Sequence, residues 1–141
     1  AGNALNTARK EIPGSFGIES AGVAFAGTGP GTSNVTEEYD GTNWTTVNTM
    51  NLTHTGCWAA GTQTDGIGGG GGPTNTSAEG YDGTNWSTRP SLGTGRASAN
   101  GLGSPSTAAA ALVSAGEPNR TATEEFTGET TTATASTIDF D

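Results

Sequence analysis

Tyr39-Asp40-Gly41-Thr42-Asn43-Trp44 recurs letter for letter as Tyr81-Asp82-Gly83-Thr84-Asn85-Trp86, 42 residues further along the chain. A fixed period of this length is the signature of a repeat architecture. Within the hexapeptide, Asp-Gly favours a hairpin, because both residue types tolerate positive φ. We therefore predict that the tyrosine ends one strand, that Asp-Gly-Thr-Asn turns the chain, and that the tryptophan begins the next strand.

The period extends in both directions from the hexapeptide. A phrase that opens with an apolar residue occurs three times, as Leu5-Asn6-Thr7-Ala8-Arg9, Met50-Asn51-Leu52-Thr53-His54 and Leu92-Gly93-Thr94-Gly95-Arg96. Each phrase is followed by a stretch of small and apolar residues that ends in glycine, at 21–27, 65–71 and 110–116. An acidic and aromatic phrase comes next, as Glu37-Glu38-Tyr39, Glu79-Gly80-Tyr81 and Glu124-Glu125-Phe126. We predict a single repeat domain, 1–141, with repeats at approximately 5–49, 50–91 and 92–141.

Each repeat is expected to form four short strands. Thr, Val, Tyr, Phe and Trp cluster between Gly, Pro and Asn, and no helical periodicity is present. In the first repeat the strands are predicted at 12–17, 21–26, 36–39 and 44–47. The glycine-rich second strand is expected to let neighbouring backbones approach closely.

The third repeat departs from this pattern. It has neither the Asp-Gly turn nor the tryptophan, and the chain then alternates, with Thr134, Ser136, Ile138 and Phe140 on one side of a predicted strand. An atypical last unit is typical of the terminal cap of a repeat array, so we expect the array to end at or near Asp141. The first repeat starts directly at the N-terminus, which leaves room for further chain before Ala1.

Composition narrows the classes of function. Five basic residues face fourteen acidic ones, for a net charge of −9, and such a surface repels the phosphates of nucleic acids. No apolar run is long enough to insert into a membrane. Hydrophobic residues make up only 30% of the chain and 24 residues are glycine. We expect a thin-cored β protein that is marginal alone and gains stability by forming an oligomer.

The repeated pattern resembles the kelch repeat, whose copies form β-propeller blades. The resemblance rests on Gly70-Gly71, on Tyr-Asp and Trp in both hexapeptides, and on Met50, Arg9 and Arg96. It departs where the second repeat has His54 in place of arginine and where the third lacks the tryptophan. The fold class it implies is all-β, with three kelch-like four-stranded antiparallel repeats; a three-sheet β-prism or a trefoil is the alternative.

The phrases themselves resemble kelch-like arrays of phage virion proteins, notably cyanophage tail fibres. Glu-Glu-Tyr-Asp-Gly-Thr-x-Trp, Gly-Thr-Gln-Thr at 61–64 and Glu-Glu-Phe-Thr-Gly at 124–128 are typical of that group. The resemblance implies an extracellular virion component with a binding or scaffolding role. Propellers close with about four to eight blades and this chain supplies three, so either the array is longer or several chains assemble. Expected partners are a homo-oligomer, or other virion or filament subunits.

No catalytic residue, metal site or cofactor is predicted. Cys57 lies three residues after His54 but in a short apolar run, where a buried thiol is ordinary. Glu37 and Glu38 are adjacent in a strand and face opposite sides, unlike the paired carboxylates of a glycosidase. Asp40 and Asn43 offer too few oxygen ligands for calcium, and the glycine run 68–72 lacks the Lys and Ser or Thr of a phosphate-binding loop.

The loops at 27–36, 71–78 and 116–123 vary between repeats and are the predicted binding regions, because loops on a rigid scaffold carry function. Trp44 and Trp86 are expected to pack between sheets, whereas Trp58 lies outside the motif and is the better ligand candidate. The candidate ligand-binding residues are Thr28, Pro30, Thr32, Asn34, Trp58, Pro73, Asn75, Pro118, Asn119 and Arg120.

We expect a non-enzymatic structural or adhesion module of a phage tail fibre or other virion appendage, which binds a host surface glycan or protein, or neighbouring subunits. The alternatives are a secreted carbohydrate-binding (lectin-like) or carbohydrate-active β protein and a purely architectural filament subunit.

Overall fold

Short antiparallel strands make up all the regular structure of the described residues. The structure, a computed structural model, describes residues 2–12, 14–29, 34–72, 74–103, 110–118, 121–127 and 130–132. The strands are β1 (Gly14–Ile18), β2 (Ala21–Phe25), β3 (Thr36–Tyr39), β4 (Trp44–Val47), β5 (Cys57–Thr62), β6 (Asp65–Gly70), β7 (Ala78–Tyr81), β8 (Trp86–Arg89), β9 (Asn100–Gly103), β10 (Ala110–Ser114), β11 (Thr123–Thr127) and β12 (Thr130–Thr132). In this part of the chain no helix occurs, and so none that could span a membrane.

The strands form three four-stranded sheets in chain order: sheet 1 (β1–β4), sheet 2 (β5–β8) and sheet 3 (β9–β12). Each sheet lies inside one predicted repeat. In the first repeat β3 and β4 have the predicted bounds, β1 is shifted by two residues at its start and one at its end, and β2 ends one residue early. The alternating strand predicted around Thr134, Ser136, Ile138 and Phe140 lies outside the described residues.

The hexapeptide forms the predicted hairpin in both copies. Asp40 Oδ1 accepts hydrogen bonds from the backbone N–H groups of Thr42 (2.8 Å) and Asn43 (2.7 Å), and Asp82 repeats both bonds at the same distances. The positive φ of the turn lies at its glycines, with 93° at Gly41. The aspartate thus serves as the hydrogen-bond acceptor of the turn, and the glycine supplies its unusual backbone conformation.

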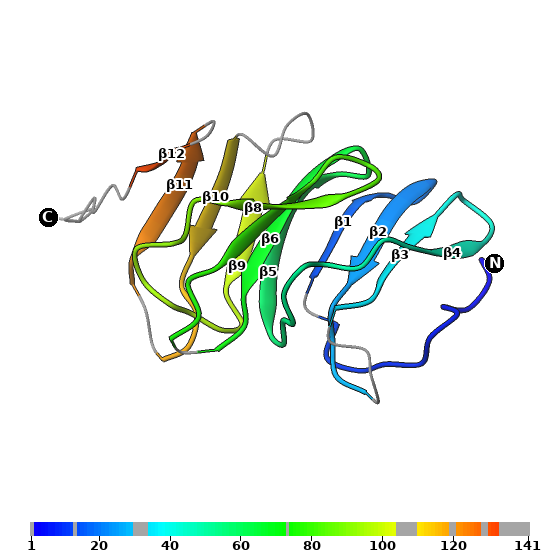
Figure 1. Cartoon of the computed structure of the whole chain (residues 1–141), viewed down its shortest axis with the longest axis horizontal. Helices are drawn as coiled ribbons and strands as arrows, with labels where there is room; N and C mark the ends of the chain where they lie inside the picture. Colours follow the sequence, from blue (N-terminus) through cyan, green and yellow to red (C-terminus); the bar gives the residue numbers. More distant parts are fainter. Residues whose placement is uncertain are drawn as a thin grey trace, which may run out of the picture.

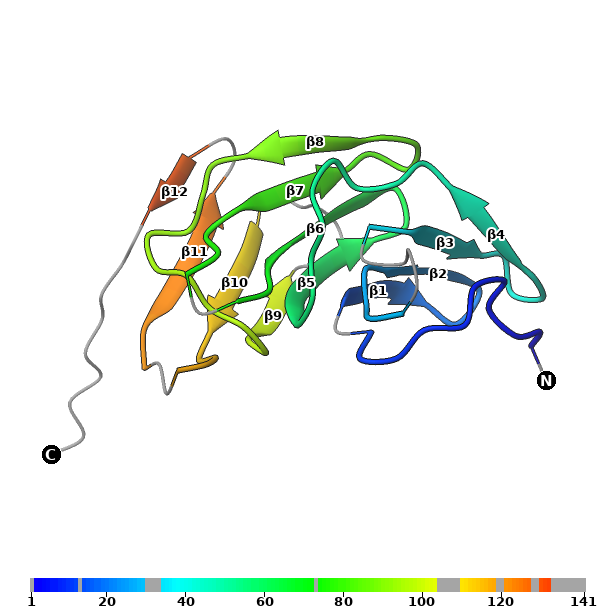
Figure 2. The same cartoon turned by 60° about the horizontal axis from the view of Figure 1, so that its bottom comes forward.

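The three sheets stand side by side, with sheet 2 between the other two (Figure 1; Figure 2). The first strands of successive repeats are neighbours, β1 beside β5 and β5 beside β9. None of the sheets closes into a barrel, so the trefoil alternative does not describe this part of the chain. The arrangement is compatible with adjacent blades of a propeller.

Two cores fill the spaces between the sheets. The core between sheets 1 and 2 contains Phe16, Val23, Phe25, Ala26, Met50, Cys57, Tyr81 and Trp86. The core between sheets 2 and 3 contains Trp58, Ala60, Ile67, Ala78, Leu92, Ala111, Val113 and Phe126. The expected packing of Trp86 between sheets is confirmed, whereas Trp44, on the outer side of sheet 1, is half-buried.

The glycines of β6 make room for aromatic rings of sheet 1. A Cβ atom on Gly66 would lie 2.2 Å from Cζ of Phe16, and one on Gly68 would lie 2.5 Å from Cζ of Phe25. We predicted that neighbouring backbones would approach closely at this glycine-rich strand. At Gly66 and Gly68 it is instead an aromatic side chain that lies against the glycine backbone. A larger residue at either position would separate the two sheets.

Candidate functional site

Each repeat buries one glutamate at the same position of its third strand. Glu37 and Glu79 are 0% exposed and Glu124 is 3% exposed. Each carboxylate accepts two backbone hydrogen bonds from the phrase that precedes its sheet, and it contacts the basic residue that ends that phrase. We call this unit the carboxylate clamp.

In the first repeat the carboxylate of Glu37 accepts hydrogen bonds from the backbone N–H groups of Asn6 (2.7 Å) and Thr7 (3.2 Å). Nη2 of Arg9 lies 3.3 Å from Oε1 of Glu37, and both side chains are buried. Burial lowers the pKa of Arg9 because it disfavours the charged guanidinium, and the charge of Glu37 acts in the opposite direction.

The third repeat builds the same clamp with a shorter ion pair. Nη2 of Arg96 lies 2.6 Å from Oε1 of Glu124, which also accepts a hydrogen bond from the N–H of Thr94. Gly93 donates to the second carboxylate oxygen. The carboxylate charge thus faces a permanent cation and two backbone dipoles.

In the second repeat a histidine replaces the arginine. Oε1 of Glu79 lies 3.3 Å from Nε2 of His54, and the N–H groups of Asn51 and Leu52 donate to the carboxylate at 2.9 Å each. Burial by itself would raise the pKa of Glu79, but the hydrogen bonds from His54, Asn51 and Leu52 outweigh burial and hold that pKa below its usual value.

The basic residue of each clamp also binds one or two backbone carbonyls at the end of the second strand of its sheet or in the loop that follows it. The clamp therefore joins three segments of one repeat: the incoming connection, the end of the second strand and the third strand. The bonds run from Arg9 to the carbonyls of Ala24 and Val35, from His54 to that of Gly70, and from Arg96 to those of Ala115 and Ala122.

In all three clamps the carboxylate ties the connection that enters the repeat to the third strand of the sheet. Their carboxylates are shielded from solvent and saturated with donors. Glu38 points to the opposite face from Glu37, as predicted, and accepts a hydrogen bond from the hydroxyl of Tyr81. Sequence reasoning aligned Arg9, His54 and Arg96 but missed their glutamate partners. The signal was present, because the glutamates recur at 42 and 45 residues, the spacing of Tyr39, Tyr81 and Phe126.

Cys57 has the structural role that was predicted. It is 1% exposed, and burial raises its pKa to about 12, so the thiol stays protonated at neutral pH. Both ring nitrogens of His54 are engaged, with the carbonyl of Gly70 and with Glu79. The histidine is therefore not positioned as a base for the thiol.

Among the predicted ligand-binding residues, Trp58 requires a correction. It is 1% exposed and packs against Phe126 with ring centroids 5.2 Å apart, so its indole face is closed to a ligand from solvent. The motif gave no reason to expect this burial, because the residue paired at the same place in sheet 1 is Gly14.

The other described candidates lie on the loops where they were expected. Pro118 is exposed, and the hydroxyl of Thr28 donates to Glu11. Asn34 and Asn75 hydrogen-bond within the scaffold. The backbone carbonyl of Asn34 accepts from the N–H of Met50, its side-chain amide donates to the carbonyl of Met50, and Oδ1 of Asn75 accepts from the N–H of Ser77. Pro30, Thr32, Pro73, Asn119 and Arg120 lie outside the described residues.

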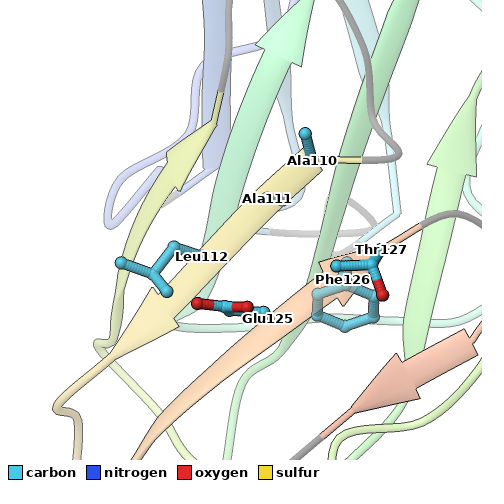
Figure 3. Close-up of a pocket in the computed structure, with 6 residues that line it drawn as sticks. All are labelled: Ala110, Ala111, Leu112, Glu125, Phe126 and Thr127. Atoms are coloured by element: carbon cyan, nitrogen blue, oxygen red, sulfur yellow. The ribbon is translucent and has the colours of Figure 1, made fainter. Parts of the chain in front are cut away.

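The surface of the described part includes the following two hollows. One, of about 290 Å³, lies between the β1–β2 and β5–β6 hairpins and is lined by Ile18, Thr62 and Gln63, among others. The other, of about 230 Å³, lies on β10 and β11 beside Leu112, Glu125 and Thr127 (Figure 3). Within the same residues no three His, Cys, Asp or Glu side chains are grouped as a metal site would require.

No family model and no curated protein matches this sequence.

Proposed function

We propose that this chain is a non-enzymatic structural or adhesion module of a phage virion, part of a tail fibre or another appendage and built of kelch-like propeller blades. The observation that supports it best is the role of the buried charged groups: the buried glutamate, arginine and histidine side chains of the described residues pair with one another in the three clamps. The virion location rests on the resemblance of the repeated phrases. The partners are a host surface glycan or protein, or neighbouring subunits.

A glycan array combined with a reducing-sugar assay tests this role. We expect binding, to glycans or to intact host cells, without sugar release. Replacing Thr28 and Pro118 by alanine should weaken that binding, while replacing the exposed Thr45 and Thr46 of β4 should leave it unchanged. Release of reducing sugar would overturn the non-enzymatic assignment in favour of a carbohydrate-active protein.

A purely architectural role is the second candidate. Sheets 1 and 3 each have an outer face turned away from sheet 2, and such faces favour packing against a neighbouring subunit. In that case replacing Thr28 and Pro118 by alanine leaves the host-cell binding of the chain at the wild-type level. Electron microscopy of particles or filaments labelled with an antibody to this chain would then place it inside an assembly rather than at a receptor-binding tip.

A further inference from the structure

The interface between sheets 1 and 2 joins two hydrogen-bond donors to two acceptors. The hydroxyl of Tyr81 donates to Oε1 of Glu38 at 2.8 Å, and Nε1 of Trp86 donates to Oγ1 of Thr36 at 3.0 Å. Tyr81 and Trp86 form the donor pair of sheet 2, and Thr36 and Glu38 form the acceptor pair of sheet 1. Each bond satisfies a polar group at the edge of an aromatic core.

The interface between sheets 2 and 3 has neither pair. Register places Ala78 and Gly80 of sheet 2 at the acceptor positions, and neither has a side-chain oxygen. At the donor positions of sheet 3 the sequence has Phe126 and Thr131, so both the phenol and the indole are absent. The donor pair and the acceptor pair are thus present together at one interface and absent together at the other.

The outer face of sheet 1 has a donor pair and the outer face of sheet 3 has an acceptor pair, at the same register positions as the pairs between sheets 1 and 2. Sheet 1 has a donor pair, Tyr39 and Trp44, on the side away from sheet 2, and both are half-buried. Sheet 3 has an acceptor pair, Thr123 and Glu125, at the register positions of Thr36 and Glu38. Glu125 is exposed.

The rings of the outer donor pair are arranged as those of the buried pair are, with the backbone of Gly2 beside the hydroxyl of Tyr39. The rings of Tyr39 and Trp44 lie 5.0 Å apart at 36°, and those of Tyr81 and Trp86 lie 5.0 Å apart at 35°. Docking would therefore require little rearrangement of these two side chains.

The two free faces carry small side chains at the positions where Phe25 and Gly68 meet in the buried interface. Between sheets 1 and 2, Phe25 packs where Gly68 leaves room for its ring. On the free faces the same two positions hold Ser114 in sheet 3 and Ala24 in sheet 1, both of which are small. The hollow of about 230 Å³ beside Leu112 and Glu125 lies on the acceptor face, where a phenol ring would enter (Figure 3).

We infer that the outer face of sheet 3 docks on the outer face of sheet 1 of a second copy of this chain, with Tyr39 donating to the second copy's Glu125 and Trp44 donating to its Thr123. The contact is head to tail, because each copy contributes a different face, and two copies can satisfy both faces by closing a ring of six sheets. The inference rests on the proposed assembly with neighbouring subunits and names that neighbour.

Sedimentation of the purified 141-residue chain tests the inference independently of any virion. We expect a species of twice the 13.9 kDa chain mass at micromolar concentration. Ser15→Arg on the exposed outer side of β1 and Leu112→Arg on the outer side of β10 should each prevent ring closure. An equimolar mixture of the two variants should form a one-to-one complex, since one intact pair of faces remains. Circular dichroism confirms that each variant is folded.

Conservative variants test the predicted hydrogen bond. Tyr39→Phe should raise the dissociation constant of the assembly by about 10- to 100-fold, the loss expected for a bond to a carboxylate, and leave the unfolding midpoint of the dissociated chain unchanged. Tyr81→Phe should leave the dissociation constant of the assembly unchanged and lower the unfolding midpoint of the dissociated chain. The inference is overturned if the wild type is monomeric at a concentration of about 100 μM. It is also overturned if the two arginine variants do not form a complex with each other, or if Tyr39→Phe leaves the dissociation constant unchanged.

Discussion

At the scale of single residues, equivalent positions of the three repeats share the same unusual backbone. At the end of the second strand, equivalent residues have positive φ in every repeat: 58° at Ala26, 72° at Gly70 and 60° at Ala115. Only the second repeat has glycine there, the residue for which this conformation costs least. The backbone conformation is thus the same in all three repeats, and the residue type at this position determines the conformational strain of the turn.

Ala115→Gly should therefore stabilise the protein. Ala115 is exposed, so little packing is lost, and relief of the left-handed strain should exceed the entropic cost of glycine and raise the free energy of unfolding by about 0.5–1 kcal/mol. Urea denaturation measures the change. Gly70→Ala is the matched control and should destabilise, because its Cβ atom would lie 2.6 Å from the carbonyl oxygen of Arg96. A loss of stability in Ala115→Gly would contradict the strain argument.

The turn aspartates give a pH dependence of known sign. Backbone hydrogen bonds from Asn43 and Thr42 lower the pKa of Asp40, and those from Asn85 and Thr84 lower that of Asp82. Because the folded pKa lies below the unfolded value of about 3.9, the stabilisation is complete above that pH and is lost as the pH falls through the folded pKa.

The double variant Asp40→Asn with Asp82→Asn should thus lose less stability than the wild type between about pH 5 and 2, since asparagine keeps the acceptor and cannot titrate. Thermal unfolding across this range measures it. The matching double alanine variant, which also lacks the acceptor, should be less stable than the asparagine variant at neutral pH. Parallel curves for wild type and asparagine variant would show that other carboxylates, Glu79 among them, control the acid response.

At the scale of elements, the carboxylate clamp is the unit that ties each sheet to its incoming connection. Glu124→Ala should lower the free energy of unfolding by about 3–5 kcal/mol, because it leaves the buried guanidinium of Arg96 without its counter-charge. Denaturant unfolding measures the loss. Arg96→Ala combined with Glu124→Ala should cost clearly less than the two single changes together, since neither partner is then left alone. Additive losses would mean that the two side chains act independently.

The strands could be predicted from sequence because their signals are local. Trp44 and Val47 bound a strand that turn chemistry and alternation define within a few residues. The clamp was missed because its partners are remote, with Glu37 separated by 31 residues from Asn6, and nothing local distinguishes a buried glutamate from a solvated one. Trp58 was misassigned for a related reason: the strand was recognisable, but the depth to which the neighbouring sheet covers it depends on packing.

At the scale of the whole molecule, the two copies of the hexapeptide have the same sequence and hairpin but different surroundings. Trp86 is 6% exposed, packs 4.9 Å from Phe25 and donates to Thr36, all across the interface between sheets 1 and 2. Trp44 stacks on Tyr39 within its own sheet and faces outward. Identical residues are therefore buried between two sheets in one copy and lie on an outer face in the other.

This difference can be measured with one substitution made in each copy. At a protein concentration low enough for single chains, Trp86→Ala should cost about 3–5 kcal/mol of unfolding free energy, and Trp44→Ala less than about 1.5 kcal/mol. At high concentration the wild-type unfolding midpoint should rise, because association stabilises the folded state by mass action, and Trp44→Ala should abolish that rise. Trp86→Ala should lower the midpoint at both concentrations. Equal costs at low concentration would show that the outer face of sheet 1 is already part of the core of a single chain, and the head-to-tail assembly would lose its donor surface.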